Sequence, residues 1–251
     1  MVTGANRGIG LAITRALLAR GARRVYASAR HTDALTPLVA DYGDRVVPLR
    51  LDVTDPRQAE AVAGRAQDVD LLINNAGIVE LGHGWADPGL YDASKREADV
   101  NVGGAVKMTQ AFAPTLAQNG GGTVVNVISI AALSNVPLFI SYSLSKAALH
   151  SFTQSTRLAL REQGTSVVGV YPGPVDTDMA ASLAFDKASP EDVANAILDG
   201  VAAGDEEIFP DAMSRAMGAT FEASPKALER QVATMLTAQA GRSHEPDRHR
   251  A

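Results

Sequence analysis

The feature that most constrains the fold is an alternation between short apolar runs and longer amphipathic segments, repeated along most of the chain. The short runs are rich in β-branched residues, which favour strands, whereas the segments between them carry apolar residues at helical spacing. Expected strands cover residues 25–29, 46–51, 71–73, 123–128, 167–171 and 207–209. Two expected helices begin near Ile9 and near Asp55, and two more cover residues 94–118 and 142–162. This order predicts an α/β fold, a doubly wound parallel sheet with helices on both faces.

No repeat and no interdomain linker divides the chain, so we expect a single domain over residues 1–240. Residues 241–251 are polar and lack periodicity, and we expect them to form a disordered tail. Only Met1 and Val2 precede the first glycine motif, where a strand of such a sheet should lead in. We therefore expect a truncated first strand.

Composition excludes several classes of function. The formal net charge is −5 and no Lys/Arg run exceeds two residues, which argues against nucleic-acid binding. The chain has no cysteine and its five histidines are scattered, so we expect neither a disulfide nor a metal site. No stretch approaches about 18 apolar residues and no leader opens the sequence, so we expect a cytoplasmic protein without a membrane span.

A glycine-rich loop precedes the first expected helix. Its residues are Thr3, Gly4, Ala5, Asn6, Arg7, Gly8, Ile9 and Gly10. Glycines permit a tight turn and let backbone N–H groups approach a pyrophosphate, which the positive end of a helix also favours. The spacing is G-x-x-x-G-x-G, and taken alone such a turn is equally compatible with a simple helix start.

The end of the second expected strand bears on the cofactor. In dinucleotide-binding sheets an acid there accepts a hydrogen bond from the ribose 2′-OH, whereas an Arg accommodates a 2′-phosphate. This chain has Ser28, Ala29 and Arg30 at that point, and Arg7 offers a second guanidinium from the glycine loop. We therefore predict a preference for NADPH over NADH, against the alternative that both are ordinary surface arginines.

Tyr142 and Lys146 are the first candidates for chemistry. They are four residues apart, so on a helix both side chains lie on one face, one turn apart. A neighbouring ammonium favours the phenolate and is expected to pull the pKa of Tyr142 toward working pH. Exposed helices often show this spacing by chance. Ser129 adds weight, because it follows a predicted strand at the sheet edge where ligands bind.

The remaining motifs also lie at strand ends or on predicted helices. Asp52 and Val53 follow the third run, and Asn74, Asn75, Ala76 and Gly77 follow the fourth. Asn101 lies within the long helical stretch, and residues 172–177 read Pro-Gly-Pro-Val-Asp-Thr. Each has a structural alternative: Asn74 and Asn75 as turn formers, Asp52 as a cap.

The order of these motifs resembles the short-chain dehydrogenase/reductase family, in its shorter single-domain, Rossmann-like form, from residue 3 to about residue 179. Ser129 stands thirteen residues before Tyr142, as that family leads us to expect. The cofactor-binding residues that the resemblance implies are Gly4, Asn6, Arg7, Gly8, Ile9, Gly10, Arg30, Asp52, Val53, Asn75, Ala76, Gly77, Tyr142, Lys146, Pro172, Gly173, Val175 and Thr177.

The resemblance also implies a mechanism, hydride transfer between NADP(H) and a small carbonyl or alcohol. In that mechanism Tyr142 donates the proton to the carbonyl oxygen, and Lys146 holds the nicotinamide ribose and lowers the pKa of Tyr142. Ser129 orients the substrate oxygen, and Asn101 helps to hold a proton-relay water. The segment between residues 177 and 190 is short and mostly apolar, which favours a modest lid over a small or apolar substrate.

Two other functions remain open. The first is a nucleotide-sugar epimerase or dehydratase of the extended subgroup, which has a different glycine spacing and an added substrate domain. The second is a non-catalytic module that senses NADP(H) or holds a partner. The intact set of Asn101, Ser129, Tyr142 and Lys146 argues against the second, because a sensor has no need of a phenol and an ammonium together. The resemblance further implies a homodimer or homotetramer and a central first strand, whose shortening would reduce stability.

Overall fold

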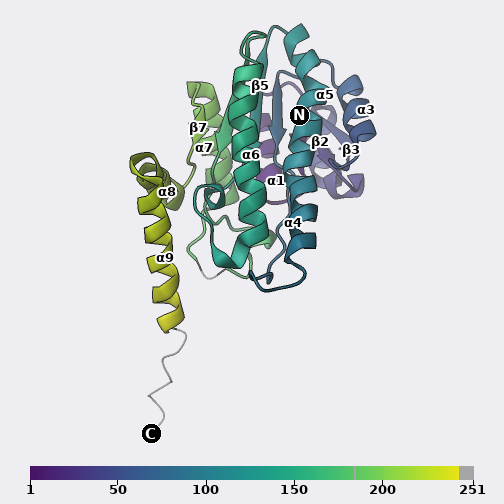
Figure 1. Cartoon of the computed structure of the whole chain (residues 1–251). Coiled ribbons are helices and arrows are strands. Elements are labelled where there is room, and N and C mark those ends of the chain that lie inside the picture. Colours follow the sequence, from purple (N-terminus) through teal and green to yellow (C-terminus); the bar gives the residue numbers. More distant parts are fainter. Residues whose placement is uncertain (184, 243–251) are drawn as a thin grey trace.

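The computed structural model describes residues 1–183 and 185–242. Its centre is a seven-stranded parallel sheet in the order β3-β2-β1-β4-β5-β6-β7 (Figure 1). The strands are β1 (Val2–Thr3), β2 (Val25–Ala29), β3 (Val46–Arg50), β4 (Leu71–Asn74), β5 (Gly122–Val127), β6 (Thr165–Val170) and β7 (Glu207–Ile208). The predicted doubly wound α/β fold is therefore confirmed. The strand order reverses between β1 and β4, which creates a crevice at the carboxyl ends of the strands.

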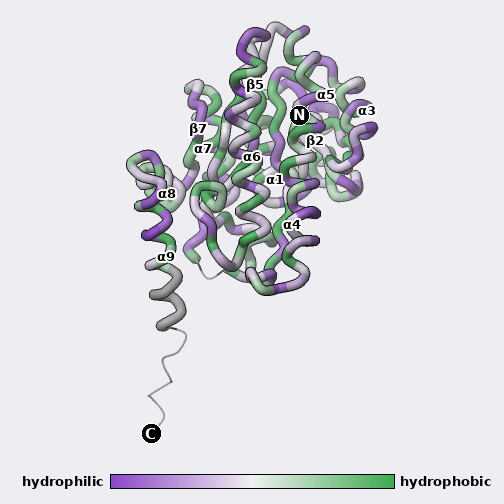
Figure 2. The backbone as a smooth tube through the Cα atoms, viewed as in Figure 1, coloured by the Kyte–Doolittle hydropathy of each residue, from purple (hydrophilic) through white to green (hydrophobic). Residues whose placement is uncertain are grey.

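The described helices are α1 (Gly8–Ala19), α2 (Thr36–Tyr42), α3 (Pro56–Arg65), α4 (Leu90–Ala98), α5 (Gly104–Gln118), α6 (Ile140–Ala159), α7 (Pro190–Ala203), α8 (Ala212–Ala223) and α9 (Pro225–Arg242). Helices α1, α2 and α7 cover one face of the sheet, and α3, α5 and α6 cover the other. Figure 2 shows the strands in the middle of the molecule as largely hydrophobic, whereas the outer helix α3 carries hydrophilic segments.

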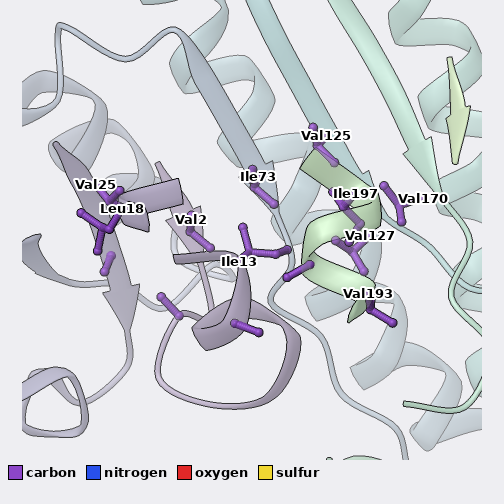
Figure 3. Close-up of a cluster of buried hydrophobic side chains, with 14 of the residues drawn as sticks. Val2, Ile13, Leu18, Val25, Ile73, Val125, Val127, Val170, Val193 and Ile197 are labelled. Atoms are coloured by element: carbon purple, nitrogen blue, oxygen red, sulfur yellow. The ribbon is translucent and has the colours of Figure 1, made fainter. Parts of the chain in front are cut away.

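The core is split by the sheet because successive side chains of a strand point to opposite faces. On β5, Val125 packs against the α1 and α7 side, whereas Val124 packs against the α3 and α5 side. Figure 3 shows the first of these clusters, to which Ile13 of α1, Ile197 of α7 and Val125 all belong. Val124 and Val125 are both completely buried, so β5 is buried on both faces there, as its apolar run predicts.

The first strand is short, as predicted, yet it holds a central position between β2 and β4. Met1 extends its pairing, since the Met1 amino group donates to the carbonyl of Leu71 at 2.7 Å and Ile73 N–H donates to the Met1 carbonyl at 2.8 Å. Val2 is completely buried. This two-residue strand thus places the glycine loop at the carboxyl ends of the central strands.

The helix predicted over residues 94–118 is divided. It begins earlier, with α4 at Leu90, and a π-helical turn over Asp99–Gly103 joins α4 to α5. Helix α9 takes in the first two residues of the tail predicted at 241–251, and residues 243–251 lie outside the described residues. Within the described ranges, no helix is both long and apolar enough to span a membrane.

Candidate active site

A cavity of about 500 Å³ opens at the carboxyl ends of the strands. It is lined by the glycine loop, by the segments that follow β2, β3, β4, β5 and β6, and by one face of α6. All of the predicted cofactor-binding residues line it except Gly10, and so do three of the four predicted catalytic residues, the exception being Asn101. The structure therefore brings motifs from most of the chain into one space.

Each glycine of the loop is required at its position for a different structural reason. Gly4 and Gly8 have positive φ values of 66° and 52°, a region that favours glycine. Gly10 lies behind the loop, and a Cβ added there would come within 2.3 Å of the Gly4 carbonyl oxygen. Gly8 approaches the segment after β6, where an added Cβ would lie 3.0 Å from a Thr177 methyl. The loop thus has room for backbone and little else.

Thr3 joins this loop to the segment after β4. Its buried hydroxyl accepts hydrogen bonds from the N–H groups of Asn75 at 2.9 Å and Ala76 at 3.0 Å. The Asn75 amide in turn donates to the Thr3 carbonyl at 2.9 Å. Sequence reasoning missed Thr3 as a site residue, although it opens the glycine motif. It acts as a positioning residue for both walls of the cavity.

The far end of the cavity carries the charged residues predicted for the adenosine. The Asp52 carboxylate accepts from the Thr54 hydroxyl at 2.7 Å and the Thr54 N–H at 3.0 Å, and these bonds, with a smaller contribution from Arg30, lower the pKa of Asp52. Arg30 is exposed at the cavity edge, and His31, which sequence reasoning missed, lines the cavity beside it.

Arg7 has a partner that the sequence did not indicate. Its guanidinium lies 3.2 Å from the carboxylate of Asp178, and both residues line the cavity. Both side chains are mostly exposed, so this ion pair contributes little to stability. Both Arg7 and Arg30 were predicted to bind the 2′-phosphate. To do so, Arg7 would have to give up its ion pair with Asp178, whereas Arg30 has no such ion pair to break among the described residues.

Tyr142 and Lys146 lie one turn apart on α6, as their spacing predicts. The Lys146 side chain is 4% exposed, its Nζ donates to the carbonyl of Val127 at 2.9 Å, and the same nitrogen is 5.5 Å from the centre of the Tyr142 ring. Ser129, just beyond β5, lines the same part of the cavity, and its hydroxyl accepts from Ala131 N–H at 3.1 Å. These three side chains form one polar cluster.

Burial dominates the acid–base properties of the cluster. It raises the pKa of Tyr142 to about 12, opposed by a hydrogen bond from Ser129, and it lowers the pKa of Lys146 to about 8. The direction for Tyr142 is opposite to the one expected from its cationic neighbour. The reason is that the loss of hydration disfavours the phenolate more than the Ser129 hydrogen bond favours it. Spacing alone does not reveal this burial.

Asn101 lies behind the cavity in the π-helical turn. Its Oδ1 accepts from Ile78 N–H at 2.8 Å, and its Nδ2 donates to the Ile78 carbonyl at 3.0 Å and to the Ser145 hydroxyl at 2.9 Å. Ser145 then donates to the carbonyl of Tyr142 at 2.7 Å. With its amide hydrogens both engaged, the Asn101 side chain links the segment after β4 to the helix that carries Tyr142.

Glu97, one turn before Asn101, was not predicted. Its side chain is completely buried, and Oε1 accepts from Glu80 N–H at 2.7 Å, whereas Oε2 has no partner among the described residues. Its negative charge raises the pKa values of both Tyr142 and Lys146. The only signal in the sequence is an acidic residue one helical turn from a candidate site asparagine.

Asp211 is a second residue that sequence reasoning missed. Its Oδ2 accepts from Gly173 N–H at 2.7 Å, and its Oδ1 accepts from Ser214 N–H at 2.8 Å at the start of α8. A Cβ at Gly173 would lie 2.8 Å from Asp211. One carboxylate therefore fixes α8 to the cavity wall. The described residues contain no group of His, Cys, Asp or Glu that could hold a metal ion.

Comparisons with known proteins agree with this geometry. The family model described as short chain dehydrogenase matches residues 1–188. The chain is similar to a galactitol 2-dehydrogenase of Agrobacterium fabrum (strain C58 / ATCC 33970), with 35% identity over 70% of each chain.

Two solved structures show the same fold. A short chain dehydrogenase from Burkholderia cenocepacia J2315 in complex with NADP is 37% identical, covers 92% of this chain and 95% of its own, and has a TM-score of 0.86. A short chain dehydrogenase/reductase from Burkholderia phymatum in complex with NAD is 25% identical, covers 92% and 93%, and has a TM-score of 0.79. The chain belongs to the short-chain dehydrogenase family of oxidoreductases, which bind nicotinamide cofactors.

Proposed function

We propose that the protein transfers a hydride between NADP(H) and a small carbonyl or alcohol, with Tyr142 as the general acid and base. The observation that carries the proposal is that Ser129, Tyr142 and Lys146 line the same cavity as the glycine loop. A proton donor and a dinucleotide site are therefore adjacent. The non-catalytic sensor has no comparable use for a partly buried phenol beside a buried ammonium.

The residues present fit a dinucleotide. The loop over residues 4–10 offers backbone N–H groups at the start of α1, which favours a pyrophosphate. Asp52, Val53 and residues 75–77 would hold the adenine and ribose side, and residues 172–177 would lie along the nicotinamide. When bound, the reduced nicotinamide supplies the hydride. All other groups that take part in the proposed reaction are side chains of the protein.

In carbonyl reduction, Ser129 donates a hydrogen bond to the substrate oxygen and Tyr142 gives that oxygen its proton. A pKa near 12 keeps the phenol protonated through neutral pH, which suits a proton donor. Lys146 remains mostly protonated below its pKa of about 8 and holds the nicotinamide ribose. Asn101 acts through Ile78 and Ser145, as a positioning residue. Alcohol oxidation runs the same steps in reverse.

The preference for NADPH rests on Arg30. The end of β2 has no acid to accept from a 2′-OH, and Arg30 stands exposed at that edge of the cavity. The related Burkholderia cenocepacia structure holds NADP, although the Burkholderia phymatum structure holds NAD. We expect Arg30→Ala to lower kcat/KM for NADPH about tenfold and to leave NADH within about twofold. Equal kcat/KM for the two cofactors in the unaltered protein would refute the preference.

A Tyr142→Phe variant tests the function itself. Turnover should fall by about 10² to 10⁴-fold, the usual contribution of a general acid, while the Kd for NADPH stays within about twofold. The sensor reading gains instead if the unaltered protein binds NADPH and reduces none of a panel of aldehydes, ketones, quinones, keto esters and steroids.

We also propose a homodimer or homotetramer assembled through the long helices. Tyr91 on α4 and Leu144 and Leu158 on α6 are large apolar side chains that are mostly exposed in the single chain. Light scattering on the purified protein measures the assembly. A Leu158→Lys variant should shift it toward the monomer.

A further inference from the structure

The cavity has a second part, beyond Ser129, that the cofactor motifs do not use. Ile130 and Val136 follow Ser129 along the chain, and they pack against Met213 and Met217 of α8 and Val232 of α9. All five side chains also line the cavity. Helices α8 and α9 therefore roof the side on which a substrate would reach Tyr142.

Charge is distributed unevenly between the two parts. The basic and acidic residues that line the cavity are Arg7, Arg30, His31, Asp52, Lys146 and Asp178. All of them belong to the cofactor motifs, to their immediate neighbours or to the Arg7 ion pair. The segments at 130–139 and 213–235 contribute none, and Ser134 is their one polar residue on the cavity wall within the described chain.

A polar substituent would lose its hydration in this part, where Ser134 is the one polar side chain on the described wall that it could meet. A buried hydroxyl without a hydrogen bond costs about 1–3 kcal/mol in proteins, and an unpaired carboxylate costs far more. Apolar substituents gain free energy in the same place, in proportion to the area that they bury. The wall chemistry thus discriminates by polarity.

Methionine is concentrated in the same wall. Four of the six methionines of the chain, Met179, Met213, Met217 and Met235, line the cavity. Met179 and Met235 are 37% and 39% exposed, which places them at the rim. Methionine is unbranched and flexible, so a surface built from it adapts to apolar groups of different shape. An open, adaptable rim accommodates a substituent larger than the cavity alone would hold.

We propose that the substrate is an uncharged carbonyl compound, or the matching alcohol, with a bulky apolar substituent that lies under α8 and α9. The proposal rests on the proposed function and narrows its substrate class. It departs from what the name of the galactitol 2-dehydrogenase implies for that relative, because a polyol would bury hydroxyls against this wall.

The test is a comparison of substrates with the full chain and NADPH. Straight-chain methyl ketones from butanone to nonanone vary apolar length at constant carbonyl reactivity, and dihydroxyacetone and pyruvate supply the polar and charged cases. Galactitol is assayed in the oxidative direction, with NADP+ in place of NADPH and with 2-nonanol as its apolar counterpart. We expect kcat/KM to rise roughly fourfold per added methylene until the wall is filled, the factor that corresponds to about 0.8 kcal/mol. The polar and charged compounds should fall at least tenfold below nonanone.

A pair of variants separates the wall from the chemistry. Met213→Gln should lower kcat/KM for nonanone at least tenfold but that for butanone less than threefold, with an unchanged Kd for NADPH. Ala216→Gln, on the exposed side of α8, is the matched control and should change neither. A flat ketone series, or faster turnover of pyruvate, dihydroxyacetone or galactitol, overturns this inference and leaves the proposed function standing. The proposed function itself is overturned if the protein binds the cofactor but reduces no carbonyl with NADPH and oxidises no alcohol with NADP+.

Discussion

The buried hydroxyl of Thr3 offers a sharp test of how the two walls of the cavity are held together. Thr3→Val keeps the shape of the side chain but removes the acceptor for the N–H groups of Asn75 and Ala76. Each buried N–H left without a partner costs about 1–3 kcal/mol. Both groups are only partly buried, so the lower end applies and the sum is about 2–3 kcal/mol.

Thr3→Ser is the matched control, because it keeps the hydroxyl and removes one buried methyl, at about 1 kcal/mol. For a chain of this length, 1 kcal/mol corresponds to about 2–4 °C in Tm. We therefore expect Thr3→Val to lower the Tm by about 4–12 °C and Thr3→Ser by about 2–4 °C. Thermal unfolding followed by circular dichroism gives both values, and fluorescence titration gives the Kd for NADPH, which should rise in the valine variant only. A valine variant as stable as the serine variant would refute the role given to the hydroxyl.

Three further predictions concern buried groups. Lys146 has a folded pKa of about 8 against about 10.5 unfolded, so its burial destabilises the fold fully below pH 8 and progressively less up to pH 10.5. Lys146→Met should therefore be more stable than the unaltered protein at pH 7, by about 2 kcal/mol after the lost bond to Val127 is subtracted. Urea titrations measure the free energy of unfolding of both proteins. The difference between them should narrow above pH 8, and a difference that stays constant would contradict this prediction. Glu97→Gln keeps an acceptor for Glu80 N–H but removes the charge that raises the pKa of Lys146, so the fall of kcat/KM for reduction above about pH 8 should move to lower pH. An Asp92→Asn control on the exposed side of α4 should leave the pH profile in place, and an unmoved profile in Glu97→Gln would count against its electrostatic role. Gly10→Ala should abolish NADPH binding, because its Cβ would lie 2.3 Å from the Gly4 carbonyl oxygen, whereas Gly64→Ala, with nothing within 4 Å, should be neutral or slightly stabilising in both binding and Tm assays.

The sheet could be predicted from the sequence because its strands are buried on both faces. An apolar, β-branched run such as that of β5 has no competing interpretation once glycines and helical segments bound it. The division between α4 and α5 could not be predicted, because a π-helical turn changes the hydrogen bonds of the backbone and leaves the apolar spacing almost unchanged. Helix α7 was missed even though Ser189 and Pro190 provide its start signals.

The candidate site divides in a similar way. Residues with a motif, such as Tyr142 and Gly4, were predicted, and they line the cavity. Thr3 and Asp211 were missed because their roles depend on contacts with residues 72 and 38 positions away. The pKa of Tyr142 was predicted in the wrong direction for a related reason: it depends on how much water the fold excludes, a property that no local spacing encodes.

The two carboxylate oxygens of Asp211 bind different segments, and this arrangement bears on how such a protein could acquire new substrates. One oxygen holds the wall on which the nicotinamide would rest, and the other begins α8, which roofs the apolar part of the cavity. Helices α8 and α9 pack through a small apolar cluster that also takes in Ile130 and Val136, apart from the two large clusters on either side of the sheet. Sequence drift or grafting can therefore remodel residues 212–235 as a unit while Asp211 keeps the new roof in register with the unchanged reaction centre. Asp211 is thus the contact that joins the reaction centre to a roof whose side chains can change with the substrate.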